Sequence, residues 1–334
     1  MNYIGSKYSL LPFLENTITD VVGEDLSNKV FCDIFAGTGV VGRAFKLKTR
    51  KIISNDWEYY SYVLNRNYIG NHVEIEGKEL FLQNLNNLEE KENGFIYNNY
   101  CKGSGSGRQY FSDKNGKKID AVRTQIENWK SKNIISEDLY FFLLASLIES
   151  ADKLANTASV YGAFLKNLKK SAQKSLVITP ALFSFNKNTH DVYCCDANEL
   201  ILKIEGDILY LDPPYNSRQY GSNYHLLNTI AEYKPFIPKG KTGLREYKRS
   251  FYCGAKTVYN SLEELIKNAN FKYIFLSYNN EGLLPFNEIS SLMSKYGHYD
   301  VLTKEYHRFR ADKEENRKHL ADKTTEYLHI LEKY

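Results

Sequence analysis

The sequence predicts an α/β fold with a doubly wound, mainly parallel sheet that a long, mainly helical insertion interrupts. Three apolar segments, "KVFCD", "KIISND" and "DILYLD", each end in an acidic residue, which is typical of buried parallel strands that present side chains at their carboxyl ends. A glycine-rich turn joins the first segment to a helical pattern, and this rhythm stops between about residues 71 and 188. An irregular stretch of that length is usually a functional subdomain. We therefore expect one domain from 1–70 and 189–334 and an inserted region at 71–188.

The individual elements follow from local patterns. Strands are expected near the start of 28–45, at 51–56, 190–196, 208–211, 272–278 and 324–333, and helices at 57–69, 119–130, 136–156, 258–268 and 285–296. Ser136 is expected to cap the helix at 136–156, and Glu137 and Asp138 make its first turn acidic. The polar, glycine-containing stretches 102–108 and 113–118 are interpreted as loops, as is the basic, proline-containing segment 234–250.

Composition narrows the class of protein. A net charge of +4 permits a nucleic-acid partner without requiring one, and some of the 27 tyrosines and 18 phenylalanines are available to stack on bases. The five cysteines form no C-x-x-C pair, and neither they nor the seven histidines have the spacing of a zinc site, so we expect reduced thiols and no metal. No apolar stretch is long enough to span a membrane and no signal peptide is evident, which predicts a soluble cytoplasmic protein.

A glycine motif marks the first strand. Gly37, Gly39 and Gly42 form G-x-G-x-x-G between a strand and a helix, and Asp56 ends the next strand. Glycine lets a ligand approach the backbone, and the acid accepts hydrogen bonds from ribose hydroxyls. This context is typical of a site for an adenosine-containing cofactor, either NAD or S-adenosylmethionine.

The stretch "ILYLDPPYNSRQY", residues 208–220, marks a second site. Two consecutive prolines cannot extend a sheet ladder, so Asp212 is left at the carboxyl end of a strand, where open α/β sheets bind ligands. Asp33, which precedes the glycine turn in "DIFAGTG", together with Asp212 distinguishes between the two cofactors. Its charge would repel a pyrophosphate, whereas it suits the methionine ammonium of S-adenosylmethionine.

With these residues the sequence resembles the S-adenosylmethionine-dependent amino methyltransferases of DNA, and more narrowly the Dam-like, alpha-class adenine-N6 methyltransferases. The resemblance rests on "NYIGSKYSLLPFL", "DIFAGTGVVGRAF" and "DPPY" in the alpha order, and it covers roughly the first 70 residues and 190–280. It implies a Rossmann-like class I methyltransferase sheet, a catalytic domain at 1–70 and 189–334, and a DNA target-recognition region at 71–188.

The resemblance also implies roles for single residues. Tyr3 and Lys7 would contact the cofactor, although Tyr3 and Ser6 stand where tryptophan and a second glycine also occur in the class. The remaining cofactor residues would be Asp33, Phe35, Gly37 and Gly39 around the methionine, Asp56 on the ribose, Trp57 against the adenine and Asp196 on its amino group. The catalytic tetrad would be Asp212, Pro213, Pro214 and Tyr215.

The chemistry of the residues agrees with this assignment. An exocyclic amino group is a weak nucleophile because its lone pair is delocalised into the ring. Asp212 and the carbonyl of Pro213 would accept its two N–H bonds and free the lone pair for in-line attack on the sulfonium methyl. Tyr215 would stack on a base rotated out of the duplex. No covalent intermediate with the enzyme is needed.

Two further groups are expected at the DNA. Lys166, Lys169, Lys170 and Lys174 would neutralise phosphates, although a solvated helix face explains them equally well. Arg218 and Gln219 follow the tetrad and would touch DNA near the flipped base. The glycine-rich segment 102–108, with Lys102 and Arg108, is interpreted as an unordered surface loop, and a loop that orders on DNA is the alternative.

The predicted function is site-specific adenine-N6 methylation of double-stranded DNA with S-adenosylmethionine, in a restriction–modification system whose endonuclease, where present, acts separately. N4-methylation of cytosine and methylation of RNA or protein remain alternatives because they use the same or related chemistry. A nucleotide-binding protein without methyl transfer is the alternative from another class. The sequence leaves the recognition sequence and the oligomeric state open.

Overall fold

The computed structural model describes residues 5–307 and 323–334, which belong to two compact units. The sheet unit contains Gly5–Trp57, Asn186–Gln219 and the described part of Arg249–Tyr334. The helical unit contains Glu58–Phe185 and Tyr220–Lys248. The expected cofactor residue Tyr3 lies outside the described residues.

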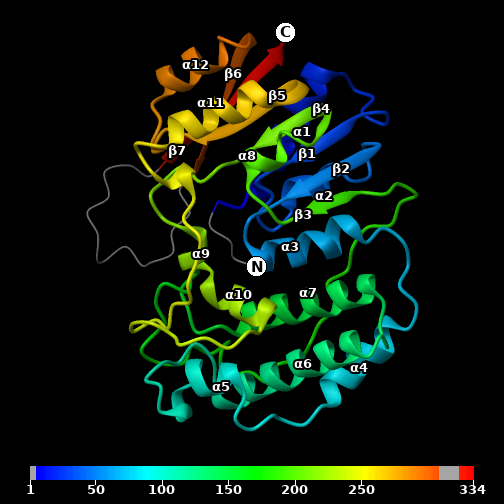
Figure 1. Ribbon diagram of the computed structural model, residues 1–334, viewed down its shortest axis with the longest axis vertical. Coiled ribbons are helices and arrows are strands. Elements are labelled where there is room, and N and C mark those ends of the chain that lie inside the picture. Colours follow the sequence, from blue (N-terminus) through cyan, green and yellow to red (C-terminus); the bar gives the residue numbers. More distant parts are fainter. Residues whose placement is uncertain (1–4, 308–322) are drawn as a thin grey trace. The chain divides into compact units, whose positions relative to one another are not determined.

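The sheet unit is built on a seven-stranded sheet in the order β3-β2-β1-β4-β5-β7-β6 (Figure 1). The strands are β1 (Val30–Asp33), β2 (Lys51–Asn55), β3 (Asp191–Tyr193), β4 (Glu205–Leu211), β5 (Asn270–Asn279), β6 (Gly297–His307) and β7 (Lys323–Lys333). Strands β1 to β5 pair in parallel, and β7 lies antiparallel between β5 and β6. The predicted mainly parallel sheet is confirmed, and β6 is an additional strand.

Helices cover both faces of this sheet. Cys32 and Leu209 pack with α8 (Ala197–Leu200), α11 (Val258–Asn268) and α12 (Phe286–Met293). On the other face Phe31 stacks on Phe45 of α2 (Val40–Phe45), with ring centroids 4.4 Å apart, and α1 (Leu11–Val22) packs against α2. Neighbouring residues of one strand thus point to opposite faces, and a core forms on each. This is the doubly wound arrangement that the sequence predicts.

The helical unit is organised around α7 (Glu137–Leu154), whose residues between Leu139 and Ala151 are nearly all buried. Four helices pack directly on it, namely α3 (Tyr59–Asn65), α4 (Lys78–Asn87), α6 (Asp113–Ser131) and α10 (His225–Glu232). Two short helices, α5 (Phe95–Tyr100) and α9 (Tyr220–Asn223), pack on α6 and α10. The predicted cap is confirmed, because Ser136 Oγ accepts a hydrogen bond from the Leu139 N–H at 3.2 Å.

The expectation of a loop at 113–118 is wrong. The segment "DKNGKK" is the start of α6, capped by Ser112, whose side chain accepts a hydrogen bond from the Asn115 N–H at 3.3 Å. Gly116 permits close packing against a neighbouring side chain and does not form a turn. A Cβ at this position would lie 2.2 Å from Cys101 Sγ. A glycine that permits close packing inside a helix therefore resembled a loop signal.

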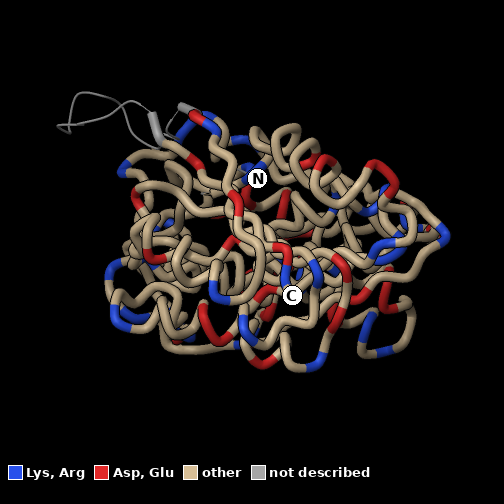
Figure 2. The backbone as a smooth tube through the Cα atoms, turned by 90° about the horizontal axis from the view of Figure 1, so that it is seen from above, with Lys and Arg blue, Asp and Glu red and all other residues tan. Residues whose placement is uncertain are grey.

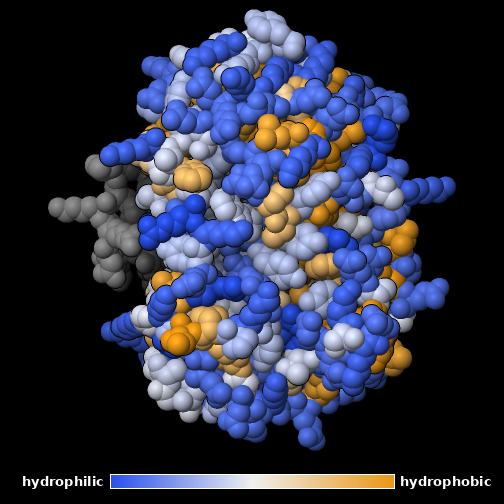
Figure 3. Space-filling model, viewed as in Figure 1, coloured by the Kyte–Doolittle hydropathy of each residue, from blue (hydrophilic) through white to orange (hydrophobic). Residues whose placement is uncertain are grey.

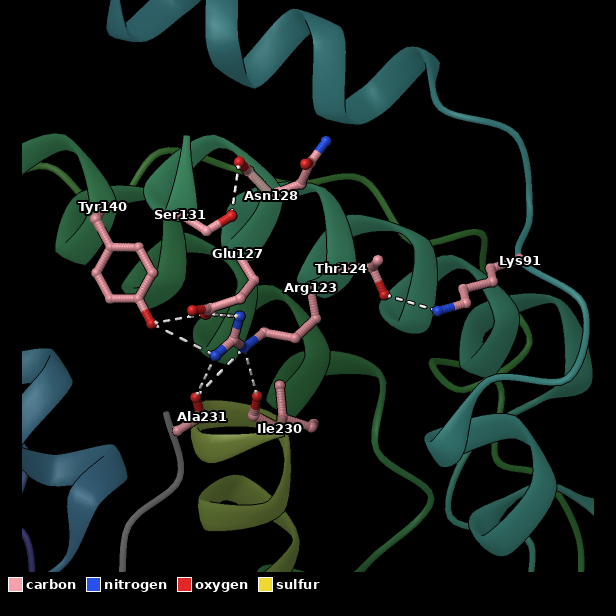
Figure 4. A network of polar contacts seen from close by, with 9 residues as sticks. All are labelled: Lys91, Arg123, Thr124, Glu127, Asn128, Ser131, Tyr140, Ile230 and Ala231. Carbon is pink, nitrogen blue, oxygen red and sulfur yellow. Dashed lines mark hydrogen bonds and ion pairs between the residues drawn. The ribbon is translucent and has the colours of Figure 1, made fainter. Parts of the chain in front are cut away.

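The helical unit also extends beyond the predicted insertion, since it includes α3 and residues 220–248. Arg123 of α6 shows what anchors this second segment (Figure 4). Its guanidinium donates to the carbonyls of Ile230 and Ala231 at the end of α10, at 3.1 and 3.0 Å, and pairs with Glu127 at 2.8 Å. The last carbonyls of a helix have no partner within it, so a buried arginine that satisfies them fixes α10 on α6.

The surface and the thiols agree with the sequence. None of the helices in residues 5–307 and 323–334 is both long and apolar enough to cross a membrane. In the view of Figure 3, hydrophilic residues cover most of the surface. All five cysteines are free thiols, with Cys32, Cys101 and Cys253 buried and Cys194 exposed.

Candidate active site

Three acidic residues stand at the carboxyl ends of neighbouring strands in the sheet unit. Asp33 ends β1, Asp56 follows β2 and Asp212 follows β4. In the parallel register Asp33 lies beside Ser54 and Tyr210, so Asp56 and Asp212 come two residues further along their own strands. Ligands of open α/β sheets bind at this edge. The structure therefore brings together the acids of the glycine motif and of the "DPPY" motif.

The glycine turn lies at the same edge. Gly37 and Gly39 have φ angles of 52° and 77°, which glycine adopts readily and other residues rarely do. The Gly37 N–H donates to Asp56 Oδ2 at 2.8 Å. Asp56 therefore holds the shape of the turn, in addition to the ribose contact that the resemblance implies.

Asn55, which sequence reasoning missed, links the strand ends. Its buried side chain donates to the carbonyl of Ile34 at 3.1 Å and to that of Cys195 at 3.2 Å. The Cys195 N–H donates back to Asn55 Oδ1 at 3.1 Å. These bonds tie the segments that follow β1 and β3 to the end of β2, and so set the backbone around the glycine turn.

Asp33 is the acid of this group with an unsatisfied atom. Its side chain is 1% exposed, and among the described residues its buried Oδ1 has no hydrogen-bond partner. Burial, together with the nearby charge of Asp212, raises the pKa of this carboxyl well above its ordinary value. A buried acceptor without a donor costs free energy, so the site is suited to a cationic ligand group that would supply one.

Asp212 forms part of a buried ionic network. Lys7 Nζ lies 3.0 Å from Asp212 Oδ1 and 3.0 Å from Glu326 Oε1, and the Ser277 hydroxyl donates to Glu326. Burial opposes the charge on Lys7, but Asp212 and Glu326 raise its pKa well above the ordinary value, so the ammonium stays protonated. Burial and Glu326 raise the pKa of Asp212 to about 6, although Lys7 acts in the opposite direction.

Aromatic rings line the neighbourhood of these charges. Lys7 Nζ lies 5.7 Å from the centroid of the Tyr215 ring, and Tyr215 makes an edge contact with Tyr278 at 6.2 Å. The carbonyl of Tyr215 accepts a hydrogen bond from the Leu283 N–H at 2.9 Å, which fixes the backbone after the two prolines. Phe35 contacts Tyr252 edge-on at 5.0 Å.

Other predicted residues have structural partners of their own. Asp196 does not end a strand, because β3 stops at Tyr193; its Oδ1 caps α8 by accepting from the Asn198 N–H at 2.8 Å. Trp57 is half-buried directly after Asp56. Gln219 makes a reciprocal pair with the Ser250 backbone, at 2.8 and 3.4 Å, whereas Arg218 is exposed. Gln219 therefore holds its own loop, and Arg218 is the more accessible of the two.

The lysine cluster of the helical unit lies on an irregular segment, so the alternative of a solvated helix face is wrong as to the helix. We call residues 165–176 the lysine segment. Its backbone is held by two buried amides: Asn156 Oδ1 accepts from the Lys169 N–H at 2.9 Å, and Asn115 Nδ2 donates to the Lys174 carbonyl at 2.8 Å. Lys166, Lys170 and Lys174 are exposed, but the Lys169 ammonium donates to the Thr157 carbonyl at 2.8 Å.

The part of the sequence that contains the lysine segment has basic residues but no acidic ones. Acidic and basic residues are interspersed along most of the chain, as Figure 2 shows, but no acid occurs between Asp152 and Asp191. The expectation of an unordered loop at 102–108 is wrong. Lys102–Ser104 form a short 3-10 helix, and Arg108 donates to the carbonyls of Asn99 and Gly240, at 3.1 and 3.0 Å. Its guanidinium is therefore used within the helical unit.

Comparison with known proteins identifies the family. Residues 3–292 match the family of D12 class N6 adenine-specific DNA methyltransferases, and the chain belongs to this family. It is an adenine-specific DNA methyltransferase. This result decides against N4-cytosine methylation, RNA or protein methylation and simple nucleotide binding.

Individual relatives agree. The chain is 62% identical to "Type II methyltransferase M.NlaIII" from Neisseria lactamica, over 100% of this chain and 99% of that protein. It is 38% identical to "Type II methyltransferase M.CviAII" from Paramecium bursaria Chlorella virus 1, over 93% of each chain. It is 39% identical to "Type II methyltransferase M.FokI" from Planomicrobium okeanokoites, where it spans 53% of the relative.

Proposed function

We propose that this enzyme is the modification methyltransferase of a type II restriction–modification system and belongs to the Dam-like alpha class. The proposal is supported by its similarity, over nearly full length, to a relative that bears the type II name. The chain order of "YIGSK", the glycine turn and "DPPY" is that of the alpha class. A restriction endonuclease of the same system would be a separate protein acting on the same sequence.

We further propose that S-adenosylmethionine is the cofactor and binds at the glycine turn. When bound, it supplies a methyl group activated by a sulfonium. The unsatisfied, buried Asp33 Oδ1 is the observation that carries the assignment, since it is an acceptor suited to the methionine ammonium. Phe35, Gly37, Gly39, Asp56, Trp57 and Asp196 would complete the pocket at this edge of the sheet.

The target adenine would be held by the tetrad. The Asp212 carboxylate and the Pro213 carbonyl would accept the two amino N–H bonds, and Tyr215 would stack on the extruded base. Because both acceptors draw the hydrogens away from the ring plane, the nitrogen lone pair becomes available for bond formation. Ionised Asp212 performs this task, which its pKa of about 6 permits at neutral pH.

The helical unit would carry DNA recognition. Exposed Lys166, Lys170 and Lys174, on a backbone held by buried amides and far in sequence from any acid, would neutralise phosphates. Phosphate contacts position a protein without reading sequence, so other residues of the unit would read the bases.

Replacement of Asp212 tests this assignment. Asp212→Ala should lower the methyl-transfer rate by at least ~10–100-fold, because a hydrogen bond to a charged acceptor contributes about 1.5–3 kcal/mol. Binding of S-adenosylmethionine, measured by calorimetry, should change little. Asp300→Ala removes an exposed acid on β6 and serves as the control. A purified Asp212→Ala enzyme that methylates at the wild-type rate would show that the tetrad is not the site.

A further inference from the structure

A buried glutamate on β7 contacts the lysine that pairs with Asp212. Glu326 is 1% exposed, its Oε1 lies 3.0 Å from Lys7 Nζ, and it also accepts a hydrogen bond from Ser277 of β5. Lys7 precedes α1, and Asp212 follows β4. Three distant parts of the chain thus bring one cation and two anions into direct contact.

Pairing of the strands does not require a charge at this position. Glu332 lies on the same strand, 46% exposed, and pairs with Lys272 at 3.2 Å. A carboxylate at the exposed site costs little, whereas a carboxylate buried as deeply as Glu326 must be compensated by partners. The location of Glu326, between a buried ammonium and a hydroxyl, therefore calls for a role beyond the sheet.

The network has an excess of negative charge, which determines how Lys7 is shared. Among the residues that the structure describes, the charged or titratable groups that face Asp212 are Lys7, Glu326 on β7, Asp33 on β1, Tyr210 on β4 and Tyr215 beyond it. Lys7 is the single cation among them. An ammonium placed at equal distance from two carboxylates binds each less tightly than it would bind one alone.

We propose that Glu326 is a positioning residue for methyl transfer: by sharing Lys7 with Asp212, it keeps the Asp212 carboxylate available to the target amino group. The inference rests on the role of Asp212 in the proposed function. Without the Glu326 charge, Lys7 would pair with Asp212 alone. The carboxylate would then be a weaker acceptor for any other donor.

The size of the effect follows from the geometry. Since both carboxylate oxygens lie 3.0 Å from the same Nζ, they are no more than about 6 Å apart. At an effective dielectric constant of about 20, two unit charges about 6 Å apart shift a pKa by about two units, and a shorter separation gives a larger shift. Glu326→Gln, which keeps the size of the side chain and its contact with Ser277, should therefore lower the pKa of Asp212 by that amount.

The measurement is a carboxyl titration of the free enzyme. Aspartate carboxyl carbons labelled with ¹³C are followed by NMR between about pH 4 and pH 8, and the Asp212 signal is assigned by its loss in Asp212→Asn. In Glu326→Gln the Asp212 titration should move to lower pH. In Lys7→Met, where the cation is lost and Glu326 remains, it should move to higher pH. Glu332→Gln, the matched control on β7, should leave it in place.

Opposite shifts in the two variants would support the proposal. An unchanged Asp212 titration in folded Glu326→Gln would overturn it, because the glutamate would then be only a structural partner of Ser277. If Glu326→Gln does not fold, Ser277→Ala serves instead: it removes the hydroxyl but leaves all three charges. The proposal would also be overturned if Asp212 titrated in Ser277→Ala as it does in the wild type and Lys7→Met showed no upward shift of the Asp212 titration.

Kinetics provide a second readout. With Glu326→Gln, kcat should fall, and the acid limb of the pH–rate profile should move to lower pH, with KM for S-adenosylmethionine nearly unchanged. A merely destabilised enzyme would lose activity at every pH alike. The NMR titration uses neither substrate nor cofactor. A failure of the proposed catalytic role of Asp212 would therefore leave the titration shift intact, and the two failures can be told apart.

Discussion

Replacing Asp33 by asparagine should stabilise the sheet unit, and the gain should grow with pH. Asp33 is buried, its Oδ1 lacks a partner among the described residues, and its pKa is raised well above the usual range by burial and by Asp212. An acid whose pKa is raised on folding contributes stability that is fully present below its unfolded pKa of about 3.9. That contribution is lost as pH rises toward the folded pKa.

The magnitude follows from proton linkage. Between the two pKa values the wild type loses about 1.4 kcal/mol of unfolding free energy for each pH unit, relative to a protein without the group. From about pH 4.5 to pH 6.5 the advantage of Asp33→Asn should therefore grow by up to roughly 3 kcal/mol. Any packing penalty of the amide lowers the unfolding free energy of the variant by the same amount at every pH. It therefore does not alter the growth of the advantage with pH. The asparagine should also weaken binding of S-adenosylmethionine, because the charge facing the ammonium is gone.

Urea unfolding of both proteins at several pH values is the assay, with Asp20→Asn as the control. Asp20 is an exposed acid of α1 in the same unit. Its replacement should change the unfolding free energy by a similar small amount at each pH. A stability difference between Asp33→Asn and the wild type that stays constant from pH 4.5 to pH 7.5 would refute the reasoning.

Three further changes test the helical unit. Replacement of Lys166, Lys170 and Lys174 by alanine should weaken binding to specific and non-specific duplexes by similar factors. It should also flatten the slope of log affinity against log salt by about 0.9 per lost contact. Lys169→Ala should leave the slope unchanged, because the Lys169 ammonium bonds to the Thr157 carbonyl. Arg123→Met should lower the unfolding free energy by about 2–4 kcal/mol, since it leaves the carbonyls of Ile230 and Ala231 without their donor. Lys114→Met replaces an exposed residue of the same helix and is the control. An equal loss of unfolding free energy in Lys114→Met would contradict the argument. Gly116→Ala should cost roughly 1–3 kcal/mol by overpacking against Cys101, and adding Cys101→Ala should recover most of it if the clash is the cause.

The parts of the fold that the sequence predicted are those that a local pattern determines. Strands β1, β2, β4 and β5 each contain consecutive apolar residues, and Ser136 is followed by two acids, so each could be recognised from a few adjacent residues. Among the described strands, β6, "GHYDVLTKEYH", pairs only with β7, and it has no apolar run, so it lacked such a signal.

In the candidate active site, too, local sequence patterns indicated some residues and only the three-dimensional structure showed others. Asp33, Asp56 and Asp212 come at strand ends, and the parallel register alone brings them to one edge of the sheet. Glu326 could not be found in this way. It and Glu332 are both glutamates on one alternating strand, and the difference between them, burial beside Lys7, exists only in three dimensions.

The position of β7 has a consequence for how the enzyme is made. It follows β5 and β6 in the sequence, yet it lies between them in the sheet. As the polypeptide leaves the ribosome, the edge of β5 therefore stays unpaired until β7 has emerged, and such an edge favours aggregation. Glu326 emerges with β7, so Lys7 cannot be shared between the two carboxylates earlier. We expect a nascent chain to remain inactive on the host genome until β7 is in place, even though its glycine turn and its Asp-Pro-Pro-Tyr segment are synthesised earlier.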